Sequence, residues 1–566
     1  MAKNKLSLHY LSLAFAIALG ALLRFWHLDF KPLWMDEVIT AIFSFGKSYN
    51  DVPLDVVFPV ERLQEVFTFQ PGVSCSQIAQ NVARYSTHPP LFFCWMYSWL
   101  GWMSPLGKEW VEKLRSLPAL SGVGAIVVMY FVNRTAFTPS AGIIAAGLMA
   151  VSPFTVYLSQ EARHYTLPML AVALALLGLI QIQQDLEKRQ TVRFWVWLRW
   201  AILNSLSFYI HYFCILSFIA QIATLFSLMY WRRANILNKR KIWLALILSI
   251  SGVAISFLPW LRIIVHHSNR AETDWLAPAN FIAPFYQTFL NWVLMVIVLP
   301  VEEQPLAVAI VCGLFMALFG IWVGWQVFKA LKQLWSIPST HLATLTLLSF
   351  SVWVLLEFFA IVYFLDKDIT AIPRYSFVYY PSFCALLAAS ISKRNSKYIL
   401  LLVGVLSCVF VISNLAFQKP FKPEQVAQHM NFEPAVPIMV VMAYRDYQDV
   451  ALGLSFGLAL EPLREFRVAV DKGDFTSVAP PNSSLPASPQ FAFFKQSPDF
   501  KSVWQQFSQL SVPATSNLNL WVIGPGRKHH DYPQQVGFAL KTHCNIDPNQ
   551  YYRIGVPYQL YRCQNL

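Results

Sequence analysis

Long apolar runs separated by short polar segments dominate residues 1–416 of this chain. Each run approaches the roughly 20 residues that a helix needs to cross a hydrocarbon core about 30 Å thick. On that length criterion we expect about eleven transmembrane helices. They lie near residues 6–26, 117–133, 139–157, 165–182, 194–211, 213–231, 242–264, 305–328, 342–365, 375–392 and 397–416. The pattern predicts a mainly α, polytopic membrane protein.

Two shorter apolar stretches, 91–106 and 284–299, are ambiguous. The basic residues decide, because cytoplasmic loops are enriched in Lys and Arg. If 91–106 crossed the membrane, the basic loops 187–193 and 232–241 would face outside, and a crossing at 284–299 would place Lys393–Lys397 outside. We therefore expect interfacial or re-entrant helices on the outer side, including one in the first external loop. The N-terminus is then cytoplasmic.

The sequence changes character after residue 416. The segment APPNSSLPASP is a polar turn region, and the runs VPIMVVMA and LNLWVIG are typical of strands. They alternate with helical stretches such as DYQDVALGLSFGLAL. The GPGR at Gly524–Arg527 lacks the full spacing of a nucleotide motif, which favours a turn. We predict a transmembrane domain over 1–416 and a small external, periplasmic-side α/β domain over 417–566.

The composition agrees with a membrane protein, since 56% of the 566 residues are hydrophobic and only 13% are charged. The net charge of +13 comes largely from basic residues in short loops between spans. That distribution indicates cytoplasmic loops, so no nucleic-acid partner is expected. Cys544 and Cys563 lie in the polar tail and are disulfide candidates if the tail faces an oxidising compartment. Four other cysteines fall within apolar runs and are expected to be packing residues: Cys214, Cys312, Cys384 and Cys408.

An acidic pair, Asp36-Glu37, follows the first apolar run in the segment FKPLWMDEVIT. Two carboxylates at a membrane surface are costly to place in an otherwise apolar chain. They suit a general base, with or without a bound cation. The alternative is a solvated helix cap, because an acidic residue favours a helix N-terminus. We favour the functional interpretation because other polar clusters share the predicted outer side.

Those clusters hold the candidate binding residues. His88, in THPPL, either marks a rigid helix start or binds a phosphate, a metal or a sugar hydroxyl. Glu161 and Arg163, in SQEARHY, either form a structural pair or place a guanidinium for phosphate binding. Arg374, in AIPRYSF, is either a lipid-interface anchor or a ligand for a diphosphate or lipid headgroup. Tyr165 is a candidate to stack on a sugar or line a lipid groove.

The order WMDE, HPPL, SQEARHY and a late RY…P resembles the bacterial membrane glycosyltransferases of the GT-C superfold. These are relatives of protein O-mannosyltransferases and of the aminoarabinose transferases that modify lipid A. The resemblance covers roughly residues 1–420. It implies a cell-envelope enzyme of the bacterial inner (plasma) membrane. Such an enzyme transfers a hexose or pentose from a polyprenyl-phosphate donor to a protein, lipid or glycan acceptor on the outer face, with inversion.

The resemblance also assigns roles. The family's acidic motif matches Asp36 and Glu37, so Asp36 is expected to be the general base and Glu37 to orient the acceptor or hold a cation. The HPP element matches His88–Pro90, and the QEAR element matches Gln160–Arg163. Some members use a divalent cation, so we leave open Mg²⁺ or Mn²⁺ at Asp36 and Glu37. Expected substrate contacts are His88, Glu161, Arg163, Tyr165 and Arg374.

Two other functions stay open from the residues alone. A lipid or solute transporter would be expected to carry inverted repeats and broken helices near the bilayer midplane, and the sequence shows neither. A non-catalytic membrane scaffold would make the acidic pair a simple cap, which leaves the location of three polar clusters on one side unexplained. The glycosyltransferase is the interpretation that uses all three clusters.

Overall fold

The computed structural model describes residues 2–189, 191–231, 239–268, 280–471, 488–509, 517–538 and 543–564. The basic residues Arg232 and Arg233 and most of the polar segment APPNSSLPASP lie outside the described residues. The chain divides into two compact units. One comprises Met1–Leu28, Val82–Trp99 and Gly107–Gln418, and the other comprises Asp29–Asn81, Leu100–Leu106 and Lys419–Leu566. The predicted domains 1–416 and 417–566 stay a prediction.

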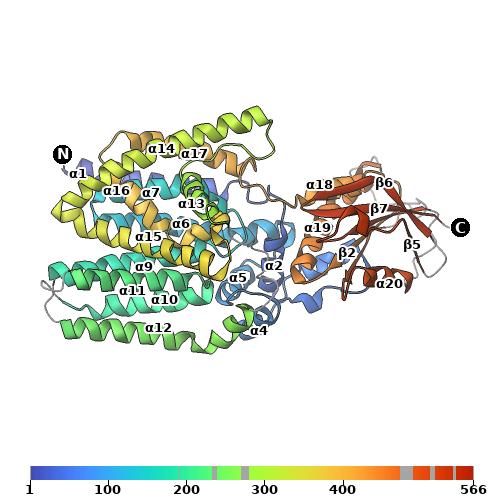
Figure 1. Ribbon diagram of the computed structural model, residues 1–566, viewed down its shortest axis with the longest axis horizontal. Coiled ribbons are helices and arrows are strands. Elements are labelled where there is room, and N and C mark those ends of the chain that lie inside the picture. Colours follow the sequence, from blue (N-terminus) through green and yellow to red (C-terminus); the bar gives the residue numbers. More distant parts are fainter. Residues whose placement is uncertain are drawn as a thin grey trace. The chain divides into compact units, whose positions relative to one another are not determined.

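The first unit is helical, and every expected span coincides with described helix (Figure 1). Six described helices are long and apolar enough to cross a membrane, or seven if one bent pair counts as a single span, so the number of spans stays a prediction. The helices are α1 (Ala2–Phe25), α6 (Trp110–Ala136), α7 (Pro139–Val151), α8 (Pro153–Ser159), α9 (Thr166–Gln184), α10 (Phe194–Ile210), α11 (Cys214–Trp231), α12 (Lys239–Ser268), α14 (Leu306–Ser336), α15 (Pro338–Leu365), α16 (Tyr380–Ile391) and α17 (Ser396–Ile412).

The two ambiguous stretches form short helices. They are α5 (Leu91–Trp102) and α13 (Ala283–Leu294), each of 12 residues. A helix of that length falls well short of a bilayer's hydrocarbon core. Both therefore have the length expected of interfacial or re-entrant helices.

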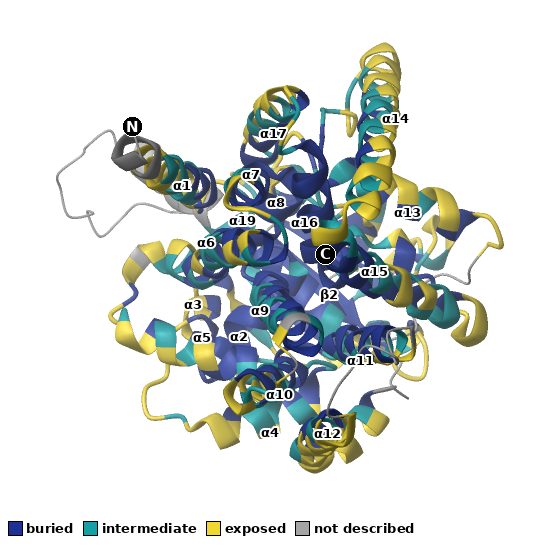
Figure 2. Cartoon of the chain, turned by 90° about the vertical axis from the view of Figure 1, so that its left-hand side faces the viewer, coloured by how far each residue is buried: buried dark blue, intermediate teal, exposed yellow. Residues whose placement is uncertain are grey.

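Burial differs sharply among the long helices. Only 11% of the most apolar window of α14 is buried within the protein, against 72% for α9. Figure 2 shows exposed residues along much of α12 and α14, whereas α9 is mostly buried. Apolar side chains that the protein leaves uncovered on a helix of this length are those expected to face lipid.

The span expected at 139–157 is broken, because α7 and α8 meet at an angle of 56°. Pro153 starts α8 and cannot donate a backbone hydrogen bond to continue α7. The freed carbonyls at the end of α7 accept from buried Arg24, whose Nη1 is 2.9 Å from the Ala150 oxygen and whose Nη2 is 2.7 Å from the Met149 oxygen. A cation at a helix C-terminus also complements the helix dipole. Arg24 thus has a structural role that explains its burial.

The second unit contains a seven-stranded sheet in the order β1-β3-β2-β4-β7-β6-β5. Its strands are β1 (Val57–Pro59), β2 (Ile438–Tyr444), β3 (Gln490–Lys495), β4 (Asn517–Ile523), β5 (Gln535–Gly537), β6 (His543–Ile554) and β7 (Val556–Gln564). β2 is parallel to both β3 and β4, and the other pairs are antiparallel. Its helices include α18 (Pro423–Met430), α19 (Tyr447–Asp471) and α20 (Lys501–Gln509). The predicted α/β character of the tail is confirmed.

Several local predictions for the tail are confirmed. The runs VPIMVVMA and LNLWVIG overlap β2 and β4, and the helical stretch overlaps α19. The GPGR segment is a turn, closed by a bond from the Arg527 amide to the Gly524 oxygen. Cys544 and Cys563 form a disulfide between β6 and β7.

The segment expected to form the first external loop also contributes to this sheet, although its sequence carries no strand signal. β1 pairs with β3, with Val57 opposite Ala492. The helix α2 (Met35–Ser44), from the same loop, packs against α19. The sheet unit therefore anchors the segment that carries the acidic pair.

Candidate active site

The acidic pair lies in the first turn of α2, whose N-cap residue Trp34 provides no side-chain cap. The position is the one that the helix-cap interpretation requires, because carboxylates stabilise a helix N-terminus. The interpretation of a solvated cap is nevertheless wrong about exposure, since only 8% of Asp36 and 1% of Glu37 is exposed. Burial of two carboxylates costs several kcal/mol per ion before compensation, so a cap alone does not account for them.

The rest of α2 holds this turn in place. Val38, Ala41 and Ile42 are fully buried, as expected for a helix packed on α19. Lys419, at the start of the second unit's C-terminal segment, lies with its Nζ 4.1 Å from the centroid of the Trp34 ring. Such a cation–π contact adds to the packing beside the acidic pair.

A separate cluster forms in the first unit around His88 and Arg163. The Arg163 Nη2 lies 3.1 Å from His88 Nε2, and His88 Nδ1 lies 3.0 Å from the Ser86 hydroxyl. A guanidinium only donates, so Nε2 accepts and Nδ1–H donates to Ser86. His88 is followed by Pro89 and Pro90, which lie immediately before α5 and restrict the backbone next to the His88 ring.

The break between α8 and α9 supplies the rest of this cluster. Gln160 is buried and donates to the Trp26 oxygen at 3.0 Å, which ties the break to the end of α1. Arg163 and Arg374 each place their guanidinium carbon 5.8 Å from the centroid of the Tyr165 ring. Two cations thus contact one aromatic ring.

Arg374 reaches this ring from a 3-10 helix, Pro373–Val378, that precedes α16. The expected span began at residue 375, but α16 begins at Tyr380 with Pro381 in its first turn. Arg374 therefore lies in the 3-10 turn and outside α16. It is half-buried there, whereas Arg163 is only 2% exposed.

Two histidines join the cluster that the sequence analysis did not single out, namely His164 and His211. The His164 ring centroid is 4.9 Å from that of His88 and 4.7 Å from that of His211. His164 lies inside the SQEARHY segment, so its polar neighbours were the available signal. His211 lies between two apolar helices, where a single histidine is more often a packed core residue.

Burial and the neighbouring cations keep these imidazoles neutral. Burial, then the Arg163 charge, lowers the pKa of His88 well below its usual value. Burial also lowers the pKa of His164 well below its usual value, and the neighbouring His211 and the Arg163 charge act in the same direction. Burial, then the Arg163 and Arg374 charges, lowers the pKa of His211 to about 3. At physiological pH the cluster therefore holds two guanidinium cations and three neutral rings.

The structure brings together some of the predicted residues. Arg163 contacts His88, and Tyr165 contacts both Arg163 and Arg374. Glu161 is buried in the same break, at 4% exposure. Asp36 and Glu37 belong to the other unit. The substrate roles of all seven residues stay predictions.

No group of three or more His, Cys, Asp or Glu side chains among the described residues could hold a metal ion. Asp36 and Glu37 offer two hard oxygen ligands, and Mg²⁺ commonly binds proteins through one or two carboxylates. The expected divalent cation stays a prediction.

A family model described as dolichyl-phosphate-mannose-protein mannosyltransferase matches residues 87–260. That range contains His88, Glu161, Arg163 and Tyr165. No curated protein sequence gives a significant match. The crystal structure of ArnT from Cupriavidus metallidurans bound to undecaprenyl phosphate is similar, with a TM-score of 0.53 and 11% identity over 99% of this chain and 98% of that chain. The apo state of that protein gives the same values.

The chain has the GT-C fold. The resemblance drawn from the motifs is thereby confirmed at the level of the fold, and so is the fold class. An oligosaccharyltransferase from Archaeoglobus fulgidus tethered with an acceptor peptide also matches, at a TM-score of 0.47 and 13% identity, over 81% of this chain and 64% of that chain.

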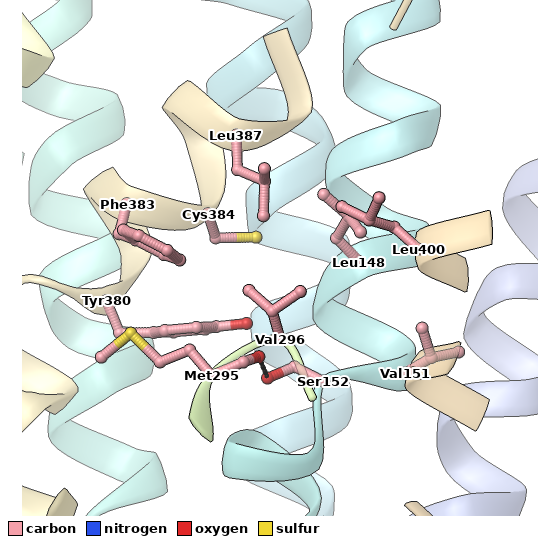
Figure 3. Close-up of a pocket in the computed structure, with 11 residues that line it drawn as sticks. Leu148, Val151, Ser152, Met295, Val296, Tyr380, Phe383, Cys384, Leu387 and Leu400 are labelled. Atoms are coloured by element: carbon pink, nitrogen blue, oxygen red, sulfur yellow. Dashed lines mark hydrogen bonds between the residues drawn. The ribbon is translucent and has the colours of Figure 1, made fainter. Parts of the chain in front are cut away.

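Within this GT-C fold, a mostly apolar pocket lies beside the break between α7 and α8 (Figure 3). Figure 3 shows Tyr380 and Cys384 on one side of it and Ser152, which donates to the Met295 oxygen, at its base. Its lining includes none of the seven candidate residues. The pocket therefore belongs to the packing around the helix break and is not part of the polar cluster.

Proposed function

We propose that this protein transfers a sugar from a polyprenyl-phosphate donor to an acceptor at the outer face of the inner membrane. The observation that carries the proposal is the pair of cations around Tyr165, at the ends of membrane helices. Guanidinium groups match phosphate oxygens in geometry and charge. The GT-C fold supports it, because ArnT, which has this fold, has been crystallised with undecaprenyl phosphate.

The chemistry follows from the donor. The Asp36 carboxylate takes the proton of the acceptor hydroxyl, whose oxygen attacks the anomeric carbon on the face opposite the phosphate. The bond from that carbon to the phosphate oxygen breaks, and the phosphate leaves with the electron pair. Arg163 and Arg374 stabilise the charge that develops on it. A phosphate is a good leaving group, so the mechanism needs no dedicated acid, and the anomeric configuration inverts.

Glu37 orients the acceptor beside Asp36. The two carboxylates are also the ligands that this chain offers to Mg²⁺ or Mn²⁺. A bound cation would supply charge neutralisation to a phosphate group. His88 positions the Arg163 guanidinium through its Nε2 acceptor.

Protein is the acceptor class to test first, because the matching family model is described as a protein mannosyltransferase. Lipid and glycan acceptors remain alternatives. The N-terminus is cytoplasmic and the sheet unit external in this proposal, as the basic loops require.

A transporter gains no support from the break between α7 and α8. Such breaks serve transporters when unwound carbonyls bind ions. Here the carbonyls of Met149 and Ala150 already accept from Arg24.

The test compares wild type with Asp36→Asn in nanodiscs, using a labelled polyprenyl-phosphate sugar and a peptide acceptor. General-base catalysis contributes about 10²–10⁴-fold, so we expect at least a 100-fold loss of transfer with unchanged folding. Asp29→Asn is the matched control, since Asp29 is exposed and precedes α2 in the same unit. Near-wild-type transfer by Asp36→Asn would remove Asp36 from the base role, and a parallel sample with chelator tests the cation.

A further inference from the structure

His164 is the one imidazole of the cluster that forms no hydrogen bond with the described residues. It is fully buried between α8 and α9, and neither of its ring nitrogens has a partner among the described residues. By contrast, both nitrogens of His88 are engaged, and His211 Nδ1 accepts from the Phe213 amide at 3.0 Å. A buried polar group without a partner is destabilising, and it is therefore rarely retained without a ligand or water to satisfy it.

The neighbours of His164 restrict what that ligand is. The aromatic rings of Phe92, His88, His211 and Tyr165 surround it, with centroids between 4.5 and 5.7 Å away. A neutral imidazole keeps one N–H donor and one acceptor. The charges that act on it from Arg163 and Arg374 are both positive. An acceptor-rich anion complements a neutral N–H beside two guanidinium groups better than a sugar hydroxyl does.

We propose that the His164 N–H donates a hydrogen bond to a phosphate oxygen of the lipid-linked donor and of the phosphate that leaves. This inference rests on the proposed function, and it adds a substrate-contacting residue that lies outside the predicted set. His164 acts as a neutral donor and undergoes no net proton transfer. Arg163 and Arg374 supply the charge, and His164 fixes the orientation of the phosphate between the rings.

Two substitutions separate this role from simple packing. His164→Phe keeps an aromatic ring among the other rings but removes the N–H, whereas His164→Asn keeps a side-chain N–H but removes the ring. A hydrogen bond to phosphate predicts that Phe raises the donor KM about tenfold and that Asn raises it less, with kcat changed little in either case. A packing role predicts the opposite order.

The measurement uses the full-length protein in nanodiscs, with initial rates over a range of donor concentrations. Polyprenyl phosphate and inorganic phosphate are then compared as competitors. Competition by both, weaker in His164→Phe, shows recognition of the phosphate group itself. Competition by polyprenyl phosphate alone, again weaker in His164→Phe, shows that the lipid is also required.

Three results would overturn the inference. They are a donor KM for His164→Phe equal to wild type, a larger effect of Asn than of Phe, and equal competition in wild type and His164→Phe. Wild-type protein that neither binds polyprenyl phosphate nor consumes any donor would overturn the proposed function as well. Normal wild-type turnover with an unaffected Phe variant would remove only the role of His164.

Discussion

At the scale of single residues, the candidate site depends on polar groups that are buried rather than solvated. Asp36 and Glu37 occupy a helix first turn with almost no exposure. His164 and His211 are buried near Arg163, and His88, which contacts Arg163, is half-buried. The sequence alone showed the residue types and the order of the two acids, His88 and Arg163. Burial was not, because it depends on which segments cover these residues, and for that reason His164 and His211 were overlooked.

The histidine cluster predicts a pH dependence of stability. The pKa of His211 is about 3 in the folded protein and near 6.5 when unfolded. The unfolded chain therefore binds more protons between these values, so stability is fully present above about pH 6.5 and falls as the pH is lowered. For His211 alone the loss at pH 5 is about 2 kcal/mol. His88 and His164 shift in the same direction.

We expect the apparent melting temperature of the protein in nanodiscs to decrease between pH 7 and pH 5. His211→Gln should flatten this decrease, because glutamine does not titrate. His341→Gln serves as the control, since His341 lies on α15, far along the chain from His211, and is only half-buried. Identical pH profiles for wild type and His211→Gln would contradict the assignment.

At the scale of elements, the hydrophobic pattern was sufficient to locate the helices of the first unit. Runs near the length of a membrane span leave little choice of structure. The pattern did not locate β1, because a three-residue strand carries no periodic signal and its partner β3 lies more than 400 residues further along the chain. Nor did it resolve the bend between α7 and α8, although Pro153 was the local signal for it.

Gly404 lies at a close helix contact in the first unit that leaves no room for a side chain. A Cβ at Gly404 of α17 would lie 2.6 Å from the backbone oxygen of Val151, at the end of α7. The backbone cannot move aside as a flexible side chain can. Gly404→Ala should therefore lower the free energy of unfolding by about 1–3 kcal/mol. Gly252→Ala on α12 is the matched control, because nothing lies within 4 Å of its Cβ.

The comparison is made by thermal unfolding of both variants in the same nanodiscs. Alanine at 252 should be neutral or stabilising by about 0.5–1 kcal/mol, since glycine weakens a helix. A Gly404→Ala variant as stable as the control would show that α17 does not approach α7 this closely.

At the scale of the whole molecule, the chain combines a membrane helical unit with a sheet unit, and each unit carries some of the candidate residues. The segment that carries α2 also supplies β1 to the sheet, so the acidic pair belongs to the sheet unit. The sequence predicted both parts and the overall class, and the GT-C fold agrees with the resemblance. The sugar and the acceptor depend on contacts that residue types alone do not specify.

The most direct test of the account is donor consumption by the purified protein. Wild type and Asp36→Asn are incubated in nanodiscs with polyprenyl-phosphate-linked hexoses and pentoses, one donor at a time, with a peptide acceptor mixture. Mass spectrometry then measures donor binding and the release of sugar-free polyprenyl phosphate. We expect wild type to bind and consume at least one donor, and Asp36→Asn to bind it without consuming it. Failure of wild type both to bind and to consume every donor would contradict a lipid-linked sugar transferase and favour a transporter or a scaffold.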